Sequence, residues 1–259
     1  MPPAYQSILR EICEGAGATA MRYWGQSQQQ RKADGSIVTD ADKACEDYIV
    51  EALSRNFPED GIVSEEGALK TGKGRTWYVD PIDGTSSFVD GLAHWGPTLG
   101  LAEAQEFIVG AFWQPRIEEF WFSQATLGAF RNDRRIIRTE TPLPGPNSPL
   151  YGPSGLHRLQ PIPWPGKLRA LGATAAHLAL VACTPGSVAF VPRWQMWDIV
   201  NGILMVELSG GVITDLGGQP WHPLRDGHKP FLAGSQHAIQ HLTQKSKFFN
   251  DVRRQTNKK

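Results

Sequence analysis

The segment from Trp77 to Phe88 constrains the fold of this chain more than any other. It begins with an aromatic and β-branched run, passes a proline, and continues in the order Asp80-Pro81-Ile82-Asp83-Gly84-Thr85-Ser86. Aromatic and β-branched residues favour strands, while acidic and hydroxyl residues favour the start of a helix. The segment therefore predicts a buried strand ending at Asp80, which delivers two carboxylates to the start of the next element.

Such an arrangement suits metal and phosphate together. The two carboxylates can converge on one point, and the Pro81–Ile82 peptide exposes a carbonyl to it; hard divalent cations prefer oxygen ligands of this kind. Gly84 lets the backbone approach a ligand, and free N–H groups at a helix start, with the hydroxyls of Thr85 and Ser86, can seat a phosphate. An acidic helix cap followed by a turn is the simpler interpretation, but it accounts for one acid and not for two across a proline.

Three further acids lie at similar local positions. Asp42 is in the first turn of a helix that Thr39 can cap, Glu65 follows an Ile-Val strand, and Asp198 begins an apolar helix. Taken alone, Asp42 and Asp198 are helix caps by default, and Glu65 is an exposed loop acid by default. If Asp80 and Asp83 hold metal, these three acids are the ones expected to join them.

Composition excludes several classes of protein. The 259 residues suffice for one large domain or two joined halves, and 26 basic residues balance 26 acidic ones. A neutral chain without a basic block gives no footprint for nucleic acid or an anionic membrane. The three cysteines are scattered, the seven histidines lack zinc spacing, and no apolar run reaches the length of a membrane span. We expect a soluble cytoplasmic protein.

The first half of the chain reads as two helices packed on a sheet. Apolar spacing predicts a helix from Tyr5 to Trp24 and a second helix after Thr39, followed by a short strand over Gly61–Ser64. Alternating apolar runs and turns then predict an antiparallel meander with strands at Thr98–Ala102, Phe107–Trp113, Glu119–Phe122, Ala129–Arg131 and Ile136–Arg138.

The second half follows a proline-rich stretch. Residues 141–166 read as a linker or irregular loop. Beyond it we expect helices over Thr174–Cys183, from about Trp197 to Leu208 and over Gln236–Phe249, with strands at Ser187–Val191 and Val212–Asp215. The expected division is an N-terminal half (1–140) with most metal ligands, a connection (141–166), and a C-terminal half (167–259) that contributes Asp198.

The order Asp80-Pro-Ile-Asp83-Gly-Thr85 resembles the signature of the inositol monophosphatase family, a group of magnesium-dependent and often lithium-inhibited phosphatases. Further blocks are similar to those of the family: Val38-Thr39-x-x-Asp42, Glu65-Glu66, Trp197-Asp198-x-x-x-Gly202 and Glu207-x-x-Gly210-Gly211. The resemblance covers nearly the whole chain apart from 141–166. It implies an α/β (α+β) sandwich of alternating helix and sheet layers, with the active site between the two halves.

The resemblance also implies a role for each acid. Glu65, Asp80 and the Ile82 carbonyl would bind one Mg²⁺ ion, while Asp80, Asp83 and Asp198 would bind a second. Thr85 would pair with Asp42 to orient and deprotonate the attacking water, so Asp42, Glu65 and Thr85 are the expected catalytic residues. Substrate would contact Asp83, Gly84, Thr85, Ser86 and Asp198.

The expected reaction is hydrolysis of a small phosphorylated metabolite, inositol monophosphate or a similar polyol phosphate, by a homodimer. Two or three Mg²⁺ ions are expected, with Mn²⁺ able to substitute and Li⁺ or Ca²⁺ inhibitory. The basic loop from Ala68 to Arg75 reads as a flexible flap that closes over the site and holds the most labile ion.

Two departures leave the substrate open. Inositol-specific members carry an acid seven positions before the Trp-Asp aspartate, where this chain has Val191. The run Gly91-Leu-Ala-His-Trp95-Gly96 is similar to the histidinol-phosphate phosphatase branch, which is therefore an alternative. An alternative of another class is a non-catalytic regulatory binding protein with the same fold. Trp95 and Trp197 are core residues by default, but either could wall the pocket.

Overall fold

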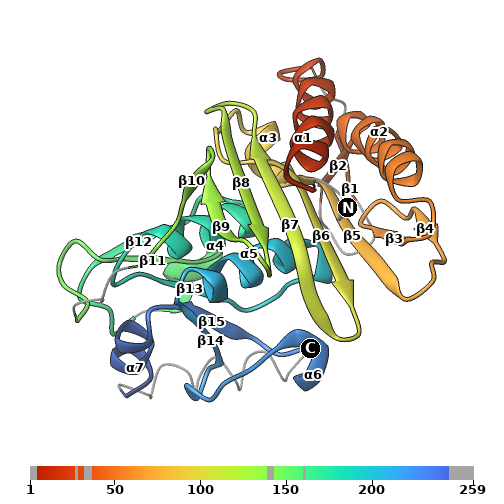
Figure 1. Cartoon of the computed structure of the whole chain (residues 1–259). Coiled ribbons are helices and arrows are strands. Elements are labelled where there is room, and N and C mark those ends of the chain that lie inside the picture. The colour runs from red at the N-terminus through yellow and green to blue at the C-terminus, as the bar shows by residue number, and fades with distance from the viewer. Residues whose placement is uncertain (1–4, 27–28, 32–36, 139–142, 160–161, 245–259) are drawn as a thin grey trace.

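The computed structural model describes residues 5–26, 29–31, 37–138, 143–159 and 162–244. Its elements form five layers, in which helices and sheets alternate (Figure 1). The expected layered α/β sandwich is confirmed. In the described part of the chain, helices that combine the length and the apolar character of a bilayer span are absent.

Helices α1 (Tyr5–Met21) and α2 (Asp40–Asn56) form the first layer and pack against one face of the large sheet. Their apolar stripes, which include Leu9, Ile12 and Ile49, share one core with the sheet residues Trp77 and Val79. The short strands β1 (Gln29–Arg31) and β2 (Ile37–Thr39) pair antiparallel and lead into α2. This layer therefore fixes the position of the first helical turn of α2.

The large sheet has eight strands in the order β10-β9-β8-β7-β6-β5-β3-β4. All neighbours are antiparallel except β3 and β5. The bounds are β3 (Gly61–Ser64), β4 (Leu69–Lys70), β5 (Arg75–Asp83), β6 (Gly96–Glu103), β7 (Glu106–Gln114), β8 (Glu119–Gln124), β9 (Gly128–Arg131) and β10 (Arg134–Arg135).

The meander from β6 to β9 is confirmed, but its last strand was placed wrongly. The structure has β10 at Arg134–Arg135, directly after a two-residue turn, instead of at Ile136–Arg138. Asn132 and Asp133 adopt φ values of 44° and 65°, which Asn and Asp tolerate better than other residues with side chains. The chain therefore reverses at once and pairs two residues earlier than the apolar pattern indicates.

The second sheet has five strands in the order β12-β11-β13-β15-β14. Its strands are β11 (Pro149–Tyr151), β12 (Lys167–Arg169), β13 (Val188–Val191), β14 (Val212–Asp215) and β15 (Phe231–Gly234). Strand β11 and the 3-10 helix η1 (Ser154–Leu159) come from the stretch expected to be a linker, which corrects that expectation. Proline is tolerated at the first position of β11 because a strand can begin there without its N–H.

Helices α4 (Thr174–Cys183) and α5 (Met196–Leu208) form the layer between the sheets, and α7 (Gln236–Gln244) covers the outer face of the second sheet (Figure 1). The expected end of α7 at Phe249 lies outside the described residues. Gly100 and Gly110 face α5, where an added Cβ would lie 2.2 Å from a Val200 methyl and 2.6 Å from the Asn201 Cβ. These glycines let α5 approach the large sheet closely and so hold its first turn beside β5.

The loop after β4 lies far from where the sequence placed it. Lys73 donates its backbone N–H to the Glu59 carbonyl at 2.9 Å, and a Cβ on Gly72 would lie 1.9 Å from the Gly61 nitrogen. These contacts fix the loop at the amino end of β3, whereas Glu65 follows its carboxyl end. The expected flap over the site is therefore wrong, because the β3–β4 hairpin carries the loop to the other end of the strand.

Candidate functional site

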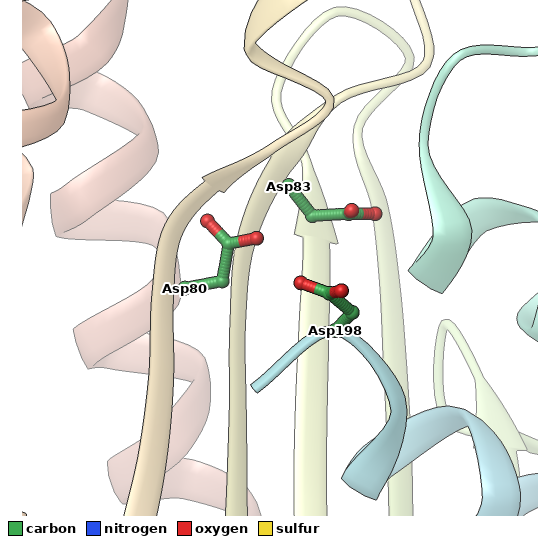
Figure 2. A group of neighbouring side chains, drawn as sticks. All are labelled: Asp80, Asp83 and Asp198. Atoms are coloured by element: carbon green, nitrogen blue, oxygen red, sulfur yellow. The ribbon is translucent and has the colours of Figure 1, made fainter. Parts of the chain in front are cut away.

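Strand β5 carries the first two acids, Asp80 and Asp83. The strand runs through both residues and does not end at Asp80, but its pairing with β6 shifts register between them. In a regular strand, residues three apart point to opposite faces of the sheet. The irregularity brings both carboxylates to one side, as Figure 2 shows. Both residues are buried, with 3% and 5% of their surface exposed.

Asp198 completes the group from α5, the helix that packs on the large sheet beside β5. It is the third residue of α5, and its carboxylate accepts the Gln195 backbone N–H at 2.7 Å. The carboxylates of Asp80, Asp83 and Asp198 point toward one another, and one oxygen from each lies within 4.8 Å of the others. The structure thus joins residues more than one hundred positions apart into a group that could hold a metal ion.

Backbone N–H groups orient the two β5 carboxylates. Asp80 accepts from Ile82 at 2.9 Å, whereas Asp83 accepts from Thr174 at 3.2 Å and from Ala175 at 2.7 Å. Ala173 offers α4 no capping side chain, so Asp83 caps this helix from a strand far earlier in the chain. The sequence did not reveal this role of Asp83. The feature that could have indicated it is that α4 begins after Ala173, a residue whose side chain cannot cap a helix.

The group is electrostatically strained. Burial raises the pKa of Asp80, and the negative charges of Glu65, Asp83 and Asp198 raise it further. The pKa of Asp83 is likewise raised by burial and by Asp198, although the α4 N–H groups oppose the shift. Like charges held together in a buried site favour either proton uptake or a bound cation. The donor set, carboxylates with a nearby backbone carbonyl, fits a hard divalent ion.

Glu65 lies beside this group, but it is not one of the three residues whose carboxylate oxygens lie within 4.8 Å of one another. It follows β3, which runs parallel to β5, and its backbone N–H donates to the Val79 carbonyl at 3.0 Å. Its side chain is half-buried, and its charge contributes to the raised pKa of Asp80. Glu65 therefore borders the three-carboxylate group from the β3 side.

Thr85 and Asp42 form a second polar pair next to the group. The Thr85 hydroxyl lies 3.2 Å from both the Asp42 carboxylate and the Ile82 carbonyl. The other oxygen of Asp42 accepts from the Thr39 N–H at 2.7 Å and from its hydroxyl at 2.6 Å, the capping interaction of α2. Burial raises the pKa of Asp42, and these hydrogen bonds oppose the rise.

The short helix α3 (Thr85–Val89) begins at Gly84, which has a φ of +89°. A Cβ at Gly84 would lie 2.9 Å from the Ala173 side chain and 3.2 Å from the His94 carbonyl, so conformation and close packing both require glycine. Ser86 is exposed, whereas Ser87 donates to the Leu171 carbonyl at 2.9 Å. The motif thus places the first backbone N–H groups of α3, which have no acceptor within a helix, directly after Asp83.

The tryptophans resolve differently. Trp95 has no exposed surface, stacks on Trp24 and meets Phe88 edge to face, so the default prediction of a core residue is confirmed and the alternative of a pocket wall is not. Trp197 is half-buried beside Asp198. Val191 ends β13 with 3% of its surface exposed.

This arrangement has a counterpart among known proteins. The family model described as the inositol monophosphatase family matches residues 4–248. The chain belongs to the inositol monophosphatase family. Its members are metal-dependent phosphatases, and this chain is accordingly a phosphoric monoester hydrolase.

Relatives within the family are named for different functions. A fructose-1,6-bisphosphatase/inositol-1-monophosphatase of Thermotoga maritima is 31% identical over 230 residues, covering 82% of this chain and 83% of that protein. A histidinol-phosphatase of Chlorobaculum parvum is 30% identical over 230 residues, covering 85% and 88%. The solved structure of the extragenic suppressor protein suhB from Bartonella henselae is 27% identical and has a TM-score of 0.84, covering 95% and 99%.

Proposed function

We propose that this protein is a Mg²⁺-dependent phosphomonoesterase that hydrolyses a small phosphorylated polyol, such as inositol monophosphate, by means of activated water. One observation carries the proposal: the group formed by the buried Asp80 and Asp83 and the half-buried Asp198 stands beside the Thr85–Asp42 pair. A metal site alone could be structural. A metal site next to a hydroxyl that is itself bonded to a buried carboxylate can also position and deprotonate a water molecule.

The residues divide into two ligand sets. Glu65, Asp80 and the Ile82 carbonyl are assigned to one Mg²⁺ ion, and Asp80, Asp83 and Asp198 to a second. Divalent ions in such sites lower the pKa of bound water and neutralise phosphate oxygens. The N–H hydrogen bonds to Asp80, Asp83 and Asp198 fix the carboxylate rotamers before any ion arrives, which lowers the cost of ordering the site.

Thr85 and Asp42 carry the proton. Water donates a hydrogen bond to the Thr85 oxygen, while the Thr85 hydroxyl donates to Asp42 at 3.2 Å. As the water oxygen bonds to phosphorus, the P–O bond to the polyol breaks on the opposite side. The water proton passes to Thr85, the Thr85 proton passes to Asp42, and the leaving alkoxide takes a proton from solvent water. A carboxylate whose pKa is raised by burial is a stronger base than an exposed one, which favours this transfer.

The phosphate and the polyol of the substrate are expected to contact different residues. Gly84, Thr85 and Ser86 are assigned to the phosphate through the free N–H groups at the start of α3. Val191 offers no acid for inositol hydroxyls, so a broad preference among polyol phosphates is expected, with histidinol phosphate as the alternative that the Chlorobaculum relative supports. Mn²⁺ should replace Mg²⁺, and Li⁺ or Ca²⁺ should inhibit.

A phosphatase panel tests the proposal. Inositol 1-phosphate, histidinol phosphate, fructose 1,6-bisphosphate and adenosine 3′,5′-bisphosphate are assayed with Mg²⁺ and with EDTA. Asp198→Asn should abolish turnover while the chain stays folded, and Asp47→Asn, an exposed aspartate of α2, should leave it unchanged. Full turnover in Asp198→Asn, or turnover that persists in EDTA, would contradict the metal assignment.

Absence of turnover on every substrate would favour the regulatory alternative, which the similarity to the suhB structure keeps in view. The same proteins are then tested for co-purifying nucleic acid at moderate salt. Chromatography with light scattering tests the proposed homodimer.

A further inference from the structure

The segment from Arg131 to Arg138 is a concentrated basic stretch in a chain whose formal net charge is +0. It contains four arginines and one aspartate in the order Arg131-Asn-Asp133-Arg134-Arg135-Ile-Ile-Arg138. The turn between β9 and β10 folds this stretch back on itself at the edge of the large sheet, opposite to β4 (Figure 1). The fold therefore gathers the charges that the sequence presents in a row.

A cavity of about 580 Å³ lies at this edge. Its lining includes Arg131, Arg134 and Arg135 from the β9–β10 hairpin, Glu119 from β8, and Cys183 from the C-terminal end of α4. Sites for small molecules have volumes of about 300–1,000 Å³. The cavity thus has the size for a compact ligand and not for a protein segment.

The lining carries an excess of positive charge. Glu119 is the one acid among its residues, and it pairs with Arg131. Asp133 contributes nothing to the cavity, because it bonds Arg10 at 2.6 Å and Gln6 at 2.7 Å on the side of α1. Within the part of the chain that the structure describes, no carboxylate forms an ion pair with Arg134 or Arg135.

The nearby helix end does not neutralise this charge. The C-terminal carbonyls of a helix bear partial negative charge. Arg138 covers the end of α4 by donating to the Val181 carbonyl, while its Nε and Nη1 atoms are buried without hydrogen-bond partners. Burial raises the pKa of the Cys183 thiol, so this residue adds no negative charge at neutral pH. Arg134 and Arg135 therefore remain available to an external anion.

Charged residues also protect edge strands from pairing with other chains. That role explains why Arg134 and Arg135 are exposed on β10. It explains neither the cavity nor the third arginine, Arg131, whose guanidinium carbon lies over the Trp121 ring at 4.8 Å from the ring centroid. Protection of the edge is therefore an incomplete account of this cluster.

We propose that the cavity between the β9–β10 hairpin and the C-terminal end of α4 binds a small anion with two or more negative charges, a polyphosphate or a phosphorylated metabolite. Guanidinium groups recognise such anions through paired N–H donors. The site is separate from the metal cluster, because Cys183 lies at the opposite end of α4 from the N–H groups that hold Asp83. A ten-residue helix places these ends about 13–15 Å apart.

Calorimetric titration of the full chain with sodium tripolyphosphate, in EDTA, tests this site apart from the metal cluster. Without Mg²⁺ the three clustered carboxylates repel phosphate, so binding in EDTA reports a second location. Loss of charged hydrogen bonds in Arg134→Gln/Arg135→Gln should weaken binding about tenfold or more. The matched control is Arg22→Gln/Arg55→Gln, which removes two exposed arginines elsewhere and should bind as the wild type does.

The proposal would be overturned by an absence of binding in EDTA. Equal weakening in both double variants would show attraction to the overall charge, and unchanged binding in the hairpin variant would place the anion elsewhere; either result would also overturn the proposal. Circular dichroism and Mg²⁺-dependent turnover verify that each variant is folded. Adenosine, which has no charge, should not compete with tripolyphosphate; competition by adenosine would also contradict an anion site.

Discussion

Replacing Asp80 by asparagine should stabilise the metal-free protein while it removes the response to metal. The amide oxygen of the asparagine can still accept the Ile82 N–H, which Asp80 accepts at 2.9 Å, and the new side chain fills nearly the same volume. The substitution removes one charge from a group whose other members, Asp83 and Asp198, remain. It therefore isolates the electrostatic cost of building an anionic site.

The size of the effect follows from the geometry. At the 4.8 Å limit that joins these carboxylates, each ionised pair repels by about 3.5 kcal/mol with an effective dielectric constant of about 20. The folded protein can avoid this by taking up a proton, which at pH 7 costs about 4 kcal/mol for a group of ordinary pKa near 3.9. Proton uptake thus caps the penalty at about 4 kcal/mol. With part of that lost to burying the amide, we expect Asp80→Asn to gain about 2 kcal/mol.

The sign of the pH dependence follows from the raised pKa. A carboxyl whose folded pKa exceeds its unfolded pKa destabilises the fold above the folded pKa, and the penalty is relieved as the pH falls toward the unfolded value. The advantage of Asp80→Asn over the wild type should therefore be largest at neutral pH. It should shrink as the pH falls toward about 4 and vanish below that, where Asp80 is protonated in both states.

Thermal unfolding in EDTA and in saturating MgCl₂ is the assay. A gain of about 2 kcal/mol corresponds to a Tm rise of about 4–8 °C for a chain of this size. Mg²⁺ at a hundred times its Kd should stabilise the wild type by about 2.7 kcal/mol and the variant far less. The control is Asp47→Asn on the exposed face of α2. A variant that is less stable than the wild type in EDTA, or that Mg²⁺ stabilises equally, would refute the reasoning.

Three further outcomes are expected. Thr85→Ala should lower kcat about a hundredfold or more and leave the Mg²⁺-induced rise in Tm intact, since the hydroxyl relays a proton; a matching loss of that rise in Tm would instead make Thr85 part of the metal site. Gly72→Ala should destabilise the chain by about 1–3 kcal/mol, because its Cβ would lie 1.9 Å from the Gly61 nitrogen. A changed Mg²⁺ dependence of turnover in this variant would show that the loop after β4 does contribute to the metal site. Because α4 joins the arginine cavity to Asp83, tripolyphosphate should shift the half-maximal free Mg²⁺ concentration, with the Mg²⁺ bound by tripolyphosphate subtracted, about fivefold in an activity titration of the wild type and not in the hairpin variant; an equal shift in both would rule out transmission through the cavity.

Local chemistry allowed the sequence to indicate several features correctly. Thr39 and Asp42 form a capping interaction within one turn of α2. Asp198 lies in the first turn of α5, as expected from its place at the start of an apolar run. Apolar spacing also indicated most of the helices and strands, whereas their layered arrangement was implied by the resemblance. The caps and the helix spacings depend on residues within about four positions of one another, and such interactions persist wherever the segment lies.

Tertiary structure alone decided how the site is assembled. Spacing in a regular strand would place Asp80 and Asp83 on opposite faces, and a register shift against β6 brings them to one side. Asp83 caps α4 from a distant strand, and the loop after β4 lies at the far end of β3. Strand pairing and helix packing between segments far apart in the chain set these positions, and they depend on which surfaces bury each other, which no local pattern specifies.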